Sequence, residues 1–208
     1  MGVFLEGVGV ITQACTLVIG LPALFLGLTG RRAAPWIVGS TIVATALVMW
    51  AKAATWWTWA NDGWMVVPIA VVIVAAFGAA AAAGSMQADA TARTPMAIST
   101  AVAAGIAGGV IAGWMWQPCV GTELGDILNH AESEPLSTSL RMVVYTAGAL
   151  LPTILLAALP TAWPAASRMI EHERARTIGL AFGAVYVLTV LSSSYDDLIG
   201  ELSRWSSA

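Results

Sequence analysis

The stretch that decides the fold is residues 64–85, WMVVPIAVVIVAAFGAAAAAGS, in which no side chain is charged. A helix needs about 20 mostly apolar residues to cross the hydrocarbon layer of a bilayer. Backbone N–H and C=O groups find no water in that layer, so they must bond to one another, as they do in an α-helix. The stretch therefore predicts a membrane-spanning helix.

Outward from this stretch, similar windows predict five more spanning helices, at residues 4–29, 34–58, 96–116, 139–163 and 177–194. Apolar residues make up 58% of the chain and charged residues 10%, and the mean hydropathy is +0.79. A soluble domain of this length could not bury that much apolar surface. The alternating strand pattern of a membrane barrel is absent from the sequence. We therefore expect an all-α integral membrane protein, with residues 1–208 forming a single membrane domain of six helices.

The arginines predict the orientation, because basic residues in short loops stay in the cytoplasm. The loops after the first, third and fifth expected helices hold Arg31, Arg32, Arg93, Arg168, Arg174 and Arg176, whereas the opposite side holds Arg141, Arg204 and Lys52. Both termini are therefore expected outside the cytoplasm. The first helix carries Glu6 and has no basic region before it, so it does not resemble a cleaved signal peptide.

The expected helices divide into two sets of three, in residues 1–92 and 93–208. Since three crossings is an odd number, the second set must be inverted relative to the first. Cys15 and Cys119 are the only cysteines, and half the length of the 208-residue chain separates them. Inverted repeats commonly hold their functional site near the midplane, between the first helices of the two halves. The pair therefore predicts thiol-disulfide chemistry inside the bilayer.

The fourth expected helix carries a distinctive pattern. Gly105, Gly109 and Gly113 are spaced by four residues, which allows a neighbouring helix to approach closely. Pro118 then removes a backbone donor and is expected to break the helix. Cys119 would lie in the first turn of a new half-helix, where free N–H groups and the helix dipole favour a thiolate.

Other chemistry has weaker signals. Glu123, Asp126 and His130 would share one face of a helix, but a single nitrogen ligand favours a solvated surface over a metal site. Motifs for zinc proteases, nucleotide phosphates, serine hydrolases and C-x-x-C dithiols are absent from the sequence. No cofactor is expected, and no basic cluster indicates nucleic acid as a partner.

Three segments carry a recognisable pattern. In the first, Phe4, Leu5 and Gly7 precede Cys15 with the spacing F-L-x-G-x7-C. The second is similar to W-T-P-C-x-G-P-x-L-G-x-I-L-x-x-A and comprises Trp116, Gln117, Pro118, Cys119, Val120, Gly121, Leu124, Gly125, Ile127, Leu128 and Ala131. The third comprises Tyr145, Gly148, Pro152 and the apolar run 155–159. Together these segments resemble the CcdA family, which includes the membrane domain of DsbD.

The resemblance implies a six-helix thiol-disulfide transporter of the prokaryotic inner (plasma) membrane. Such a protein takes electrons from cytoplasmic thioredoxin and passes them to an extracytoplasmic thioredoxin-like protein, commonly for cytochrome c maturation. It implies that Cys15 and Cys119 are the catalytic redox pair. Pro118 and Gly121 would shape the site around Cys119, and Pro152 would kink the fifth helix beside it.

The sequence departs from the family beside its first cysteine. Family members usually flank this cysteine with prolines, whereas here Ala14 precedes Cys15 and Val18 follows, with Pro22 the nearest proline. The first helix is therefore expected to stay regular. Two alternatives follow: a non-catalytic CcdA-like subunit packed within a larger membrane complex of respiratory type, and a transporter of a small ion or metal that uses Glu6, Lys52 and the acidic segment.

Overall fold

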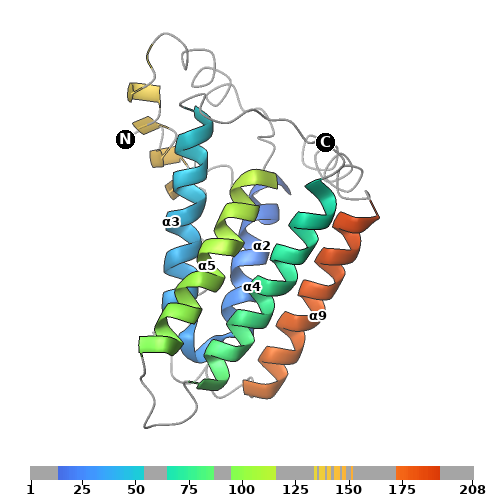
Figure 1. The fold of residues 1–208 in the computed structure, drawn as a ribbon. Helices are drawn as coiled ribbons and strands as arrows, with labels where there is room; N and C mark the ends of the chain where they lie inside the picture. Colours follow the sequence, from blue (N-terminus) through green and yellow to red (C-terminus); the bar gives the residue numbers. More distant parts are fainter. Residues whose placement is uncertain are drawn as a thin grey trace.

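The computed structural model describes residues 14–53, 65–86, 95–115 and 172–192, together with residues 134, 136–138, 140–141, 143–145, 147–148 and 151. Within these residues the structure is helical and has no strands, as the sequence predicts (Figure 1). The elements are α2 (Ala14–Thr29), the short 3-10 helix η2 (Arg31–Ala33), α3 (Ala34–Ala53), α4 (Val66–Met86), α5 (Pro95–Met115) and α9 (His172–Leu191).

Proline positions account for several of the helix starts. Pro35, Pro68 and Pro95 each lie in the first turn of α3, α4 and α5 respectively. The N–H groups of a first turn have no intrahelical acceptor, so a proline there removes no hydrogen bond.

The spans differ from the expected windows mainly at the start of α9, which begins at His172 and not at residue 177. Residues 172–176 are mostly polar, so a hydropathy window excludes them although they form the first helical turn. Four described stretches are long and apolar enough to cross a membrane: Arg31–Ala51, Val66–Met86, Pro95–Met115 and Glu173–Leu191. They show that the chain has the character of a multi-pass membrane protein.

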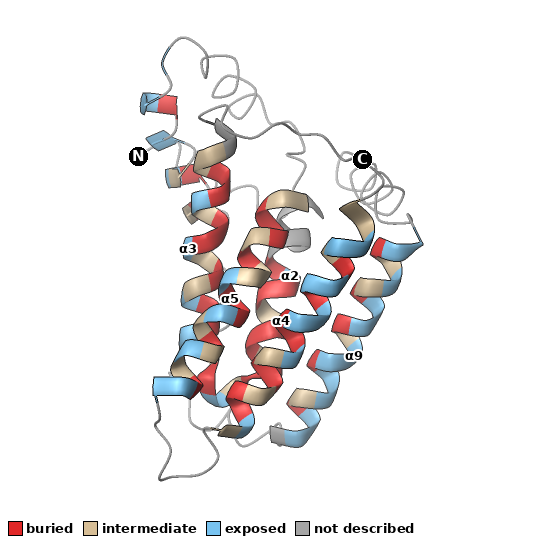
Figure 2. Cartoon of the chain, in the orientation of Figure 1, coloured by how far each residue is buried: buried red, intermediate tan, exposed pale blue. Residues whose placement is uncertain are grey.

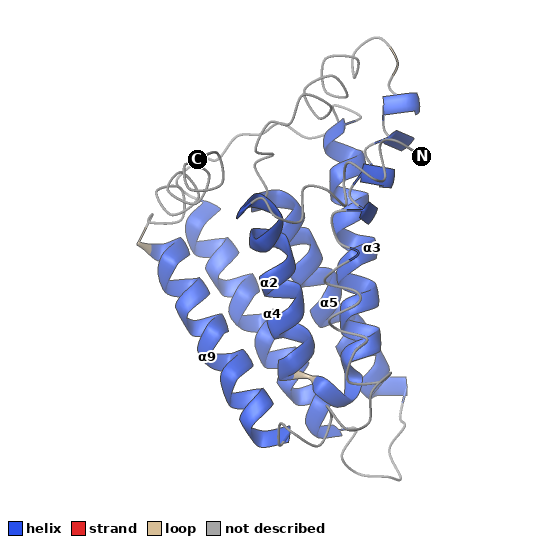
Figure 3. Ribbon diagram, turned by 180° about the vertical axis from the view of Figure 1, so that it is seen from behind, coloured by secondary structure: helices blue, strands red, loops and turns tan. Residues whose placement is uncertain are grey.

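The described helices run roughly alongside one another; α2, α3, α4 and α5 alternate in direction, and α9 runs in the same direction as α5 (Figure 1). The most extensive contact is between α3 and α5, while α4 packs on α5 and on α9. Seen from behind, α2 crosses in front of the others (Figure 3), and it contacts α3, α4, α5 and α9. α2 is therefore the helix that every other long described helix touches.

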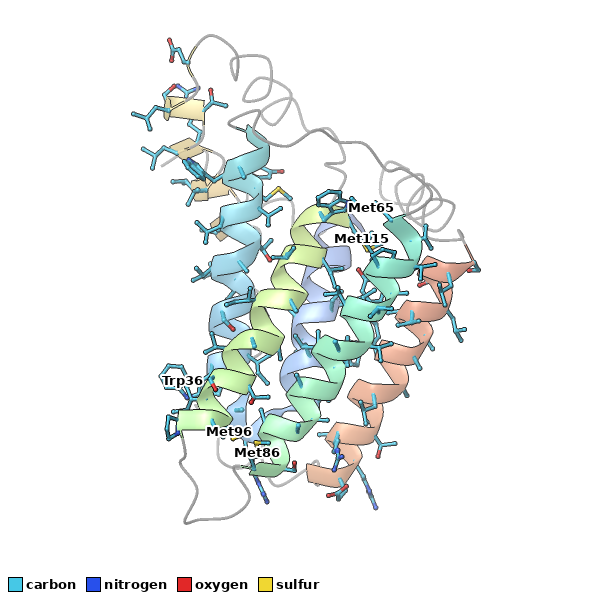
Figure 4. All side chains as sticks on the ribbon, in the orientation of Figure 1. Trp36, Met65, Met86, Met96 and Met115 are labelled. Atoms are coloured by element: carbon cyan, nitrogen blue, oxygen red, sulfur yellow. The ribbon has the colours of Figure 1, made fainter. Side chains whose placement is uncertain are left out.

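Four arginines of the described residues lie at one end of the bundle. Trp36, Met86 and Met96 lie at one end, and Met65 and Met115 lie at the other, which we call the far end (Figure 4). The first end holds η2 with Arg31 and Arg32 and the first turns of α9 with Arg174 and Arg176, and η2 contacts α9. We call it the arginine end. The structure thus places these four arginines at one end of the bundle, in agreement with the expectation that their loops lie on the same side of the membrane.

The bundle buries small residues and exposes large apolar ones (Figure 2). In α4, Ala70, Ala76 and Ala80 are buried, while Val67 and Val74 are 62% and 60% exposed. Such exposure is unfavourable in water. In a bilayer it has little cost, because lipid tails are as apolar as the side chains.

The described residues between 136 and 151 show the same pattern within the fifth expected helix. Leu136, Leu140 and Val144 are exposed at four-residue spacing, whereas Tyr145 is 2% exposed. The helix is already formed at Leu136, three residues before the expected start. Most of residues 149–163 lies outside the described residues, as does the part of the first expected helix before Ala14.

Candidate functional site

Of the predicted site residues, the structure describes the backbone of Cys15. It is the second residue of α2 as described. Cys119, Pro118, Gly121 and Pro152 lie outside the described residues. The predicted break of the fourth helix at Pro118 lies outside them as well.

The position of Cys15 along α2 follows from helix geometry. At a rise of 1.5 Å per residue, the segment from Cys15 to Thr29 is about 21 Å long. Thr29 is at the arginine end, next to η2. Cys15 therefore lies in the half of α2 nearer the far end. Met115, the last residue of α5, is at the same end (Figure 4).

The described part of the first expected helix is continuous on the C-terminal side of Cys15. α2 continues without interruption from Ala14 to Thr29, through Pro22. Proline has no N–H, so the carbonyl of Val18 receives no helical hydrogen bond from it. A small cavity of about 10 Å³, about the limit for one water, lies beside Pro22 and is also lined by Leu26 and Tyr186. At Pro22, α2 thus has one fewer backbone hydrogen bond than a helix without proline.

A row of aromatic rings joins α2 to α9 and α4. Phe25 and Phe182 stack with centroids 4.0 Å apart and planes 10° apart, and Phe182 continues to Tyr186 at 6.1 Å. Phe77 of α4 meets Phe182 at 6.5 Å. The Tyr186 hydroxyl donates to the sulfur of Met115, 3.3 Å away. The row thus runs from the middle of α2 to the far end of α5.

No sequence motif indicated this row of rings, although part of its pattern is visible in the sequence. Phe182 and Tyr186 are four residues apart and therefore share one face of a helix. The partner Phe25 is more than 150 positions away in sequence, so only the tertiary structure identifies it.

The glycine stripe of α5 packs against α3, as its spacing predicts. A Cβ atom added to Gly105 would meet the carbonyl oxygen of Ile37, and one added to Gly109 would meet that of Thr41. At Gly113 it would lie 2.8 Å from the Cβ of Val48. The two backbones are therefore so close that a single methyl group would force them apart.

Buried hydroxyl groups in this contact are satisfied inside the helices. Thr41 Oγ1 donates to the carbonyl of Ile37 at 2.8 Å. Thr45 Oγ1 lies 2.8 Å from the Thr41 carbonyl and 3.2 Å from the Gly109 carbonyl of α5. One hydroxyl proton is shared between an intrahelical and an interhelical acceptor, which ties α3 to α5.

The outer side of the same helix pair forms a groove of about 750 Å³. Its walls are residues of α3 and α5, namely Pro35, Trp36, Gly39, Ser40, Val43, Ala44, Leu47, Val48, Ala51, Val102, Ile106 and Val110. No sequence motif indicated it, because a groove depends on how two helices pack. It is a concave, mostly apolar surface formed by described residues of two helices.

The metal alternative gains no support from the described residues. They contain no group of three His, Cys, Asp or Glu side chains able to hold a metal ion. Of the acidic segment, the structure describes Glu134, whose Oε2 accepts a hydrogen bond from Ser137 Oγ at 2.9 Å. Glu123, Asp126 and His130 lie outside the described residues, as does Glu6.

The fold and the candidate site define a multi-pass α-helical membrane protein. No family model, curated protein or solved structure matches the chain.

Proposed function

We propose that this protein is a CcdA-like thiol-disulfide electron relay of a prokaryotic inner membrane, with Cys15 and Cys119 as its redox pair. It has six spanning helices in a 3+3 inverted repeat, and the arginine end faces the cytoplasm. Both termini are then extracytoplasmic. Reducing equivalents pass from cytoplasmic thioredoxin to an extracytoplasmic thioredoxin-like protein that serves cytochrome c maturation.

One observation carries the proposal: the Cys15 half of α2 and the last turn of α5 lie at the same end of the bundle. α5 is described up to Met115, four residues before Cys119. Four residues span at most about 14 Å, whereas α5 is about 30 Å long. The chain cannot return to the arginine end over that distance, and α2 contacts α5. This arrangement supports a pairing of the two cysteines.

The proposed reaction is a balanced two-electron exchange. A thiolate of reduced thioredoxin attacks the Cys15–Cys119 disulfide and forms a mixed disulfide, which the second thioredoxin thiol then resolves. Thioredoxin becomes oxidised, and both membrane cysteines become thiols. Their two electrons and two protons then pass to the disulfide of the extracytoplasmic protein by the same exchange in reverse order.

Partners on opposite faces must reach the pair in turn, which requires a movement of the helices. Pro22 has no N–H, so bending α2 at this residue would break no hydrogen bond donated by residue 22. We propose that Pro22 makes α2 flexible, as the prolines beside the first cysteine would do in the family.

The second candidate function is a non-catalytic subunit of a larger membrane complex. The observation that favours it is the uninterrupted α2, because a regular apolar helix shields a cysteine from soluble partners. A subunit of this kind works without either thiol.

Trapping of a mixed disulfide tests the relay. A Cys15→Ala or Cys119→Ala variant retains one thiol, and a thioredoxin that lacks its own resolving cysteine cannot release it. With diamide as the oxidant that joins the two thiols, one of the two variants is expected to accumulate a covalent adduct with this thioredoxin. The readout is a mass shift on non-reducing gels that dithiothreitol abolishes. Transfer measured with oxidised acceptor should fall to background in both variants.

The double Cys15→Ala, Cys119→Ala variant is the matched control, and it should form no adduct. If both single variants form no adduct, and the double variant supports growth and assembly like the native chain, the relay is wrong. The subunit function is then the remaining proposal.

A further inference from the structure

The groove between α3 and α5 opens away from the core of the bundle. Gly108, on the α2 side of α5, lies so close to Leu26 that an added Cβ would be 2.8 Å from its side chain. Ile106 precedes Gly108 by two residues, or about 200° around the helix. The groove that Ile106 lines therefore faces the surroundings of the bundle.

The groove is apolar over nearly its whole length. The hydroxyl of Ser40 lies 2.7 Å from the carbonyl of Trp36 and 3.1 Å from that of Ile37, so it already has an acceptor. The other lining side chains are aliphatic, apart from Trp36 at one end. An occupant of the groove is therefore a hydrocarbon.

The end of the groove has a different chemistry. Trp36 is 50% exposed at the arginine end, and Arg32 is exposed one turn before it. Tryptophan side chains favour the membrane interface, and arginines near the surface attract anionic lipid headgroups. The groove therefore complements a phospholipid, because its apolar walls suit an acyl chain and the arginine at its end suits an anionic headgroup.

The shape of the groove favours a flexible chain over another helix. Helices pack closely in membranes through small residues, and the groove lining includes Gly39, Ser40 and Ala44 of α3 but no glycine of α5. The rim of the groove instead carries Val43, Leu47 and Ile106, which are 59%, 58% and 47% exposed. These side chains hold a second helix backbone at a distance but leave room for an acyl chain between them.

We propose that the groove binds one anionic phospholipid, whose phosphate lies at Arg32 and whose acyl chain lies along α3. The groove runs from Pro35 to Ala51, which is roughly 24 Å along the helix axis. One leaflet of hydrocarbon is about 15 Å thick. The groove is therefore long enough for a full acyl chain that enters from the leaflet at the arginine end.

Gly39 allows a direct test of the acyl site. It lines the groove, and a Cβ added there meets nothing within 4 Å. A phenylalanine side chain at position 39 therefore starts in open space within the groove, and Gly39→Phe should occupy part of the groove. Gly78 of α4 is equally open and exposed but lies outside the groove, so Gly78→Phe is the matched control.

The measurement is native mass spectrometry of the full chain in detergent, titrated with dioleoyl phosphatidylglycerol or dioleoyl phosphatidylcholine. The native chain and Gly78→Phe should retain one phosphatidylglycerol, and Gly39→Phe should bind it at least tenfold more weakly. Equal retention by the two variants contradicts the proposal. A native chain that binds no lipid also contradicts it. If the native chain is a dimer and Gly39→Phe is a monomer, the groove is an interface between two copies of the chain, and the lipid site is wrong.

The headgroup site has its own variant pair. Arg32→Gln should lower the preference for phosphatidylglycerol over phosphatidylcholine about fivefold, the effect of about one surface charge. Arg176→Gln makes the same charge change at the same end, but on α9, and should leave the preference unchanged. If the two variants reduce the preference equally, the effect belongs to the overall charge of this end, and the proposed site is wrong.

Discussion

At the scale of single residues, the contact between α3 and α5 depends on a few atoms. Thr45 is fully buried, and its one hydroxyl proton has acceptors on both helices. In a membrane such interhelical hydrogen bonds contribute about 0.6 kcal/mol on average and up to about 1.7 kcal/mol.

Replacement of this hydroxyl by a methyl group isolates its contribution. Thr45→Val should lower the free energy of unfolding by about 0.5 to 1.5 kcal/mol, measured by titration of mixed micelles with dodecyl sulfate and circular dichroism. Thr100→Val is the control, because the Thr100 hydroxyl bonds only within α5, to the Met96 carbonyl, at 2.8 Å. Equal losses in the two variants would show that the contact to Gly109 contributes nothing.

The sequence predicted the role of some of these residues and not of others. The four-residue spacing of Gly105, Gly109 and Gly113 indicated a helix contact, since small residues at that spacing have few other uses in a membrane helix. Nothing comparable identified Thr45 or Phe25. The partners of these two residues lie on other helices, and hydropathy contains no information about which helix faces which.

At the scale of helices, the distance between the α3 and α5 backbones sets the stability of their contact. Gly109→Ala adds one methyl group that meets the Thr41 carbonyl and lies 2.7 Å from the Cβ of Ala44. Overpacking of this kind costs about 1 to 3 kcal/mol. We expect the free energy of unfolding to fall by that amount in the same micelle titration.

Gly78→Ala is the control for Gly109→Ala, because Gly78 is also in a helix but faces open space. Alanine is favoured over glycine in a helix by up to about 1 kcal/mol, so this variant should be unchanged or slightly more stable. A gain in both variants would mean that α3 and α5 are farther apart than the structure indicates.

Hydropathy predicted the existence of the helices better than their ends. The window at 64–85 corresponds to α4 within two residues, because all of its side chains are uncharged. The window at 177–194 missed the first turn of α9, where His172, Glu173 and Arg174 are helical but polar. A helix that extends beyond the hydrocarbon layer has no apolar signal at that end.

At the scale of the whole molecule, the four arginines at the arginine end predict the orientation, with that end in the cytoplasm. Ser85 is exposed in the last turn of α4 at the arginine end, and Ser192 is exposed directly after α9 at the far end. Both can be changed to cysteine in a chain without Cys15 and Cys119, and neither change alters the charge that sets the topology.

Labelling of whole cells with a membrane-impermeant maleimide gives the readout. Ser192→Cys should react in intact cells, whereas Ser85→Cys should react only after the membrane is opened. The reverse pattern would place the arginine end outside and would remove the assignment of thioredoxin to that face. Reaction of both positions in intact cells would contradict a membrane-embedded bundle.

The contact between α9 and α2 is of the same kind as the contact between α3 and α5, and this has a consequence for motion. A Cβ atom added to Gly179 of α9 would meet Thr29 Oγ1 and lie 2.8 Å from the carbonyl oxygen of Phe25 on α2. The stacked rings of Phe25 and Phe182 join the same two helices. We therefore expect α2 and α9 to stay fixed as one unit during any rearrangement, and α3 and α5 as another, because neither pair slides without a steric clash.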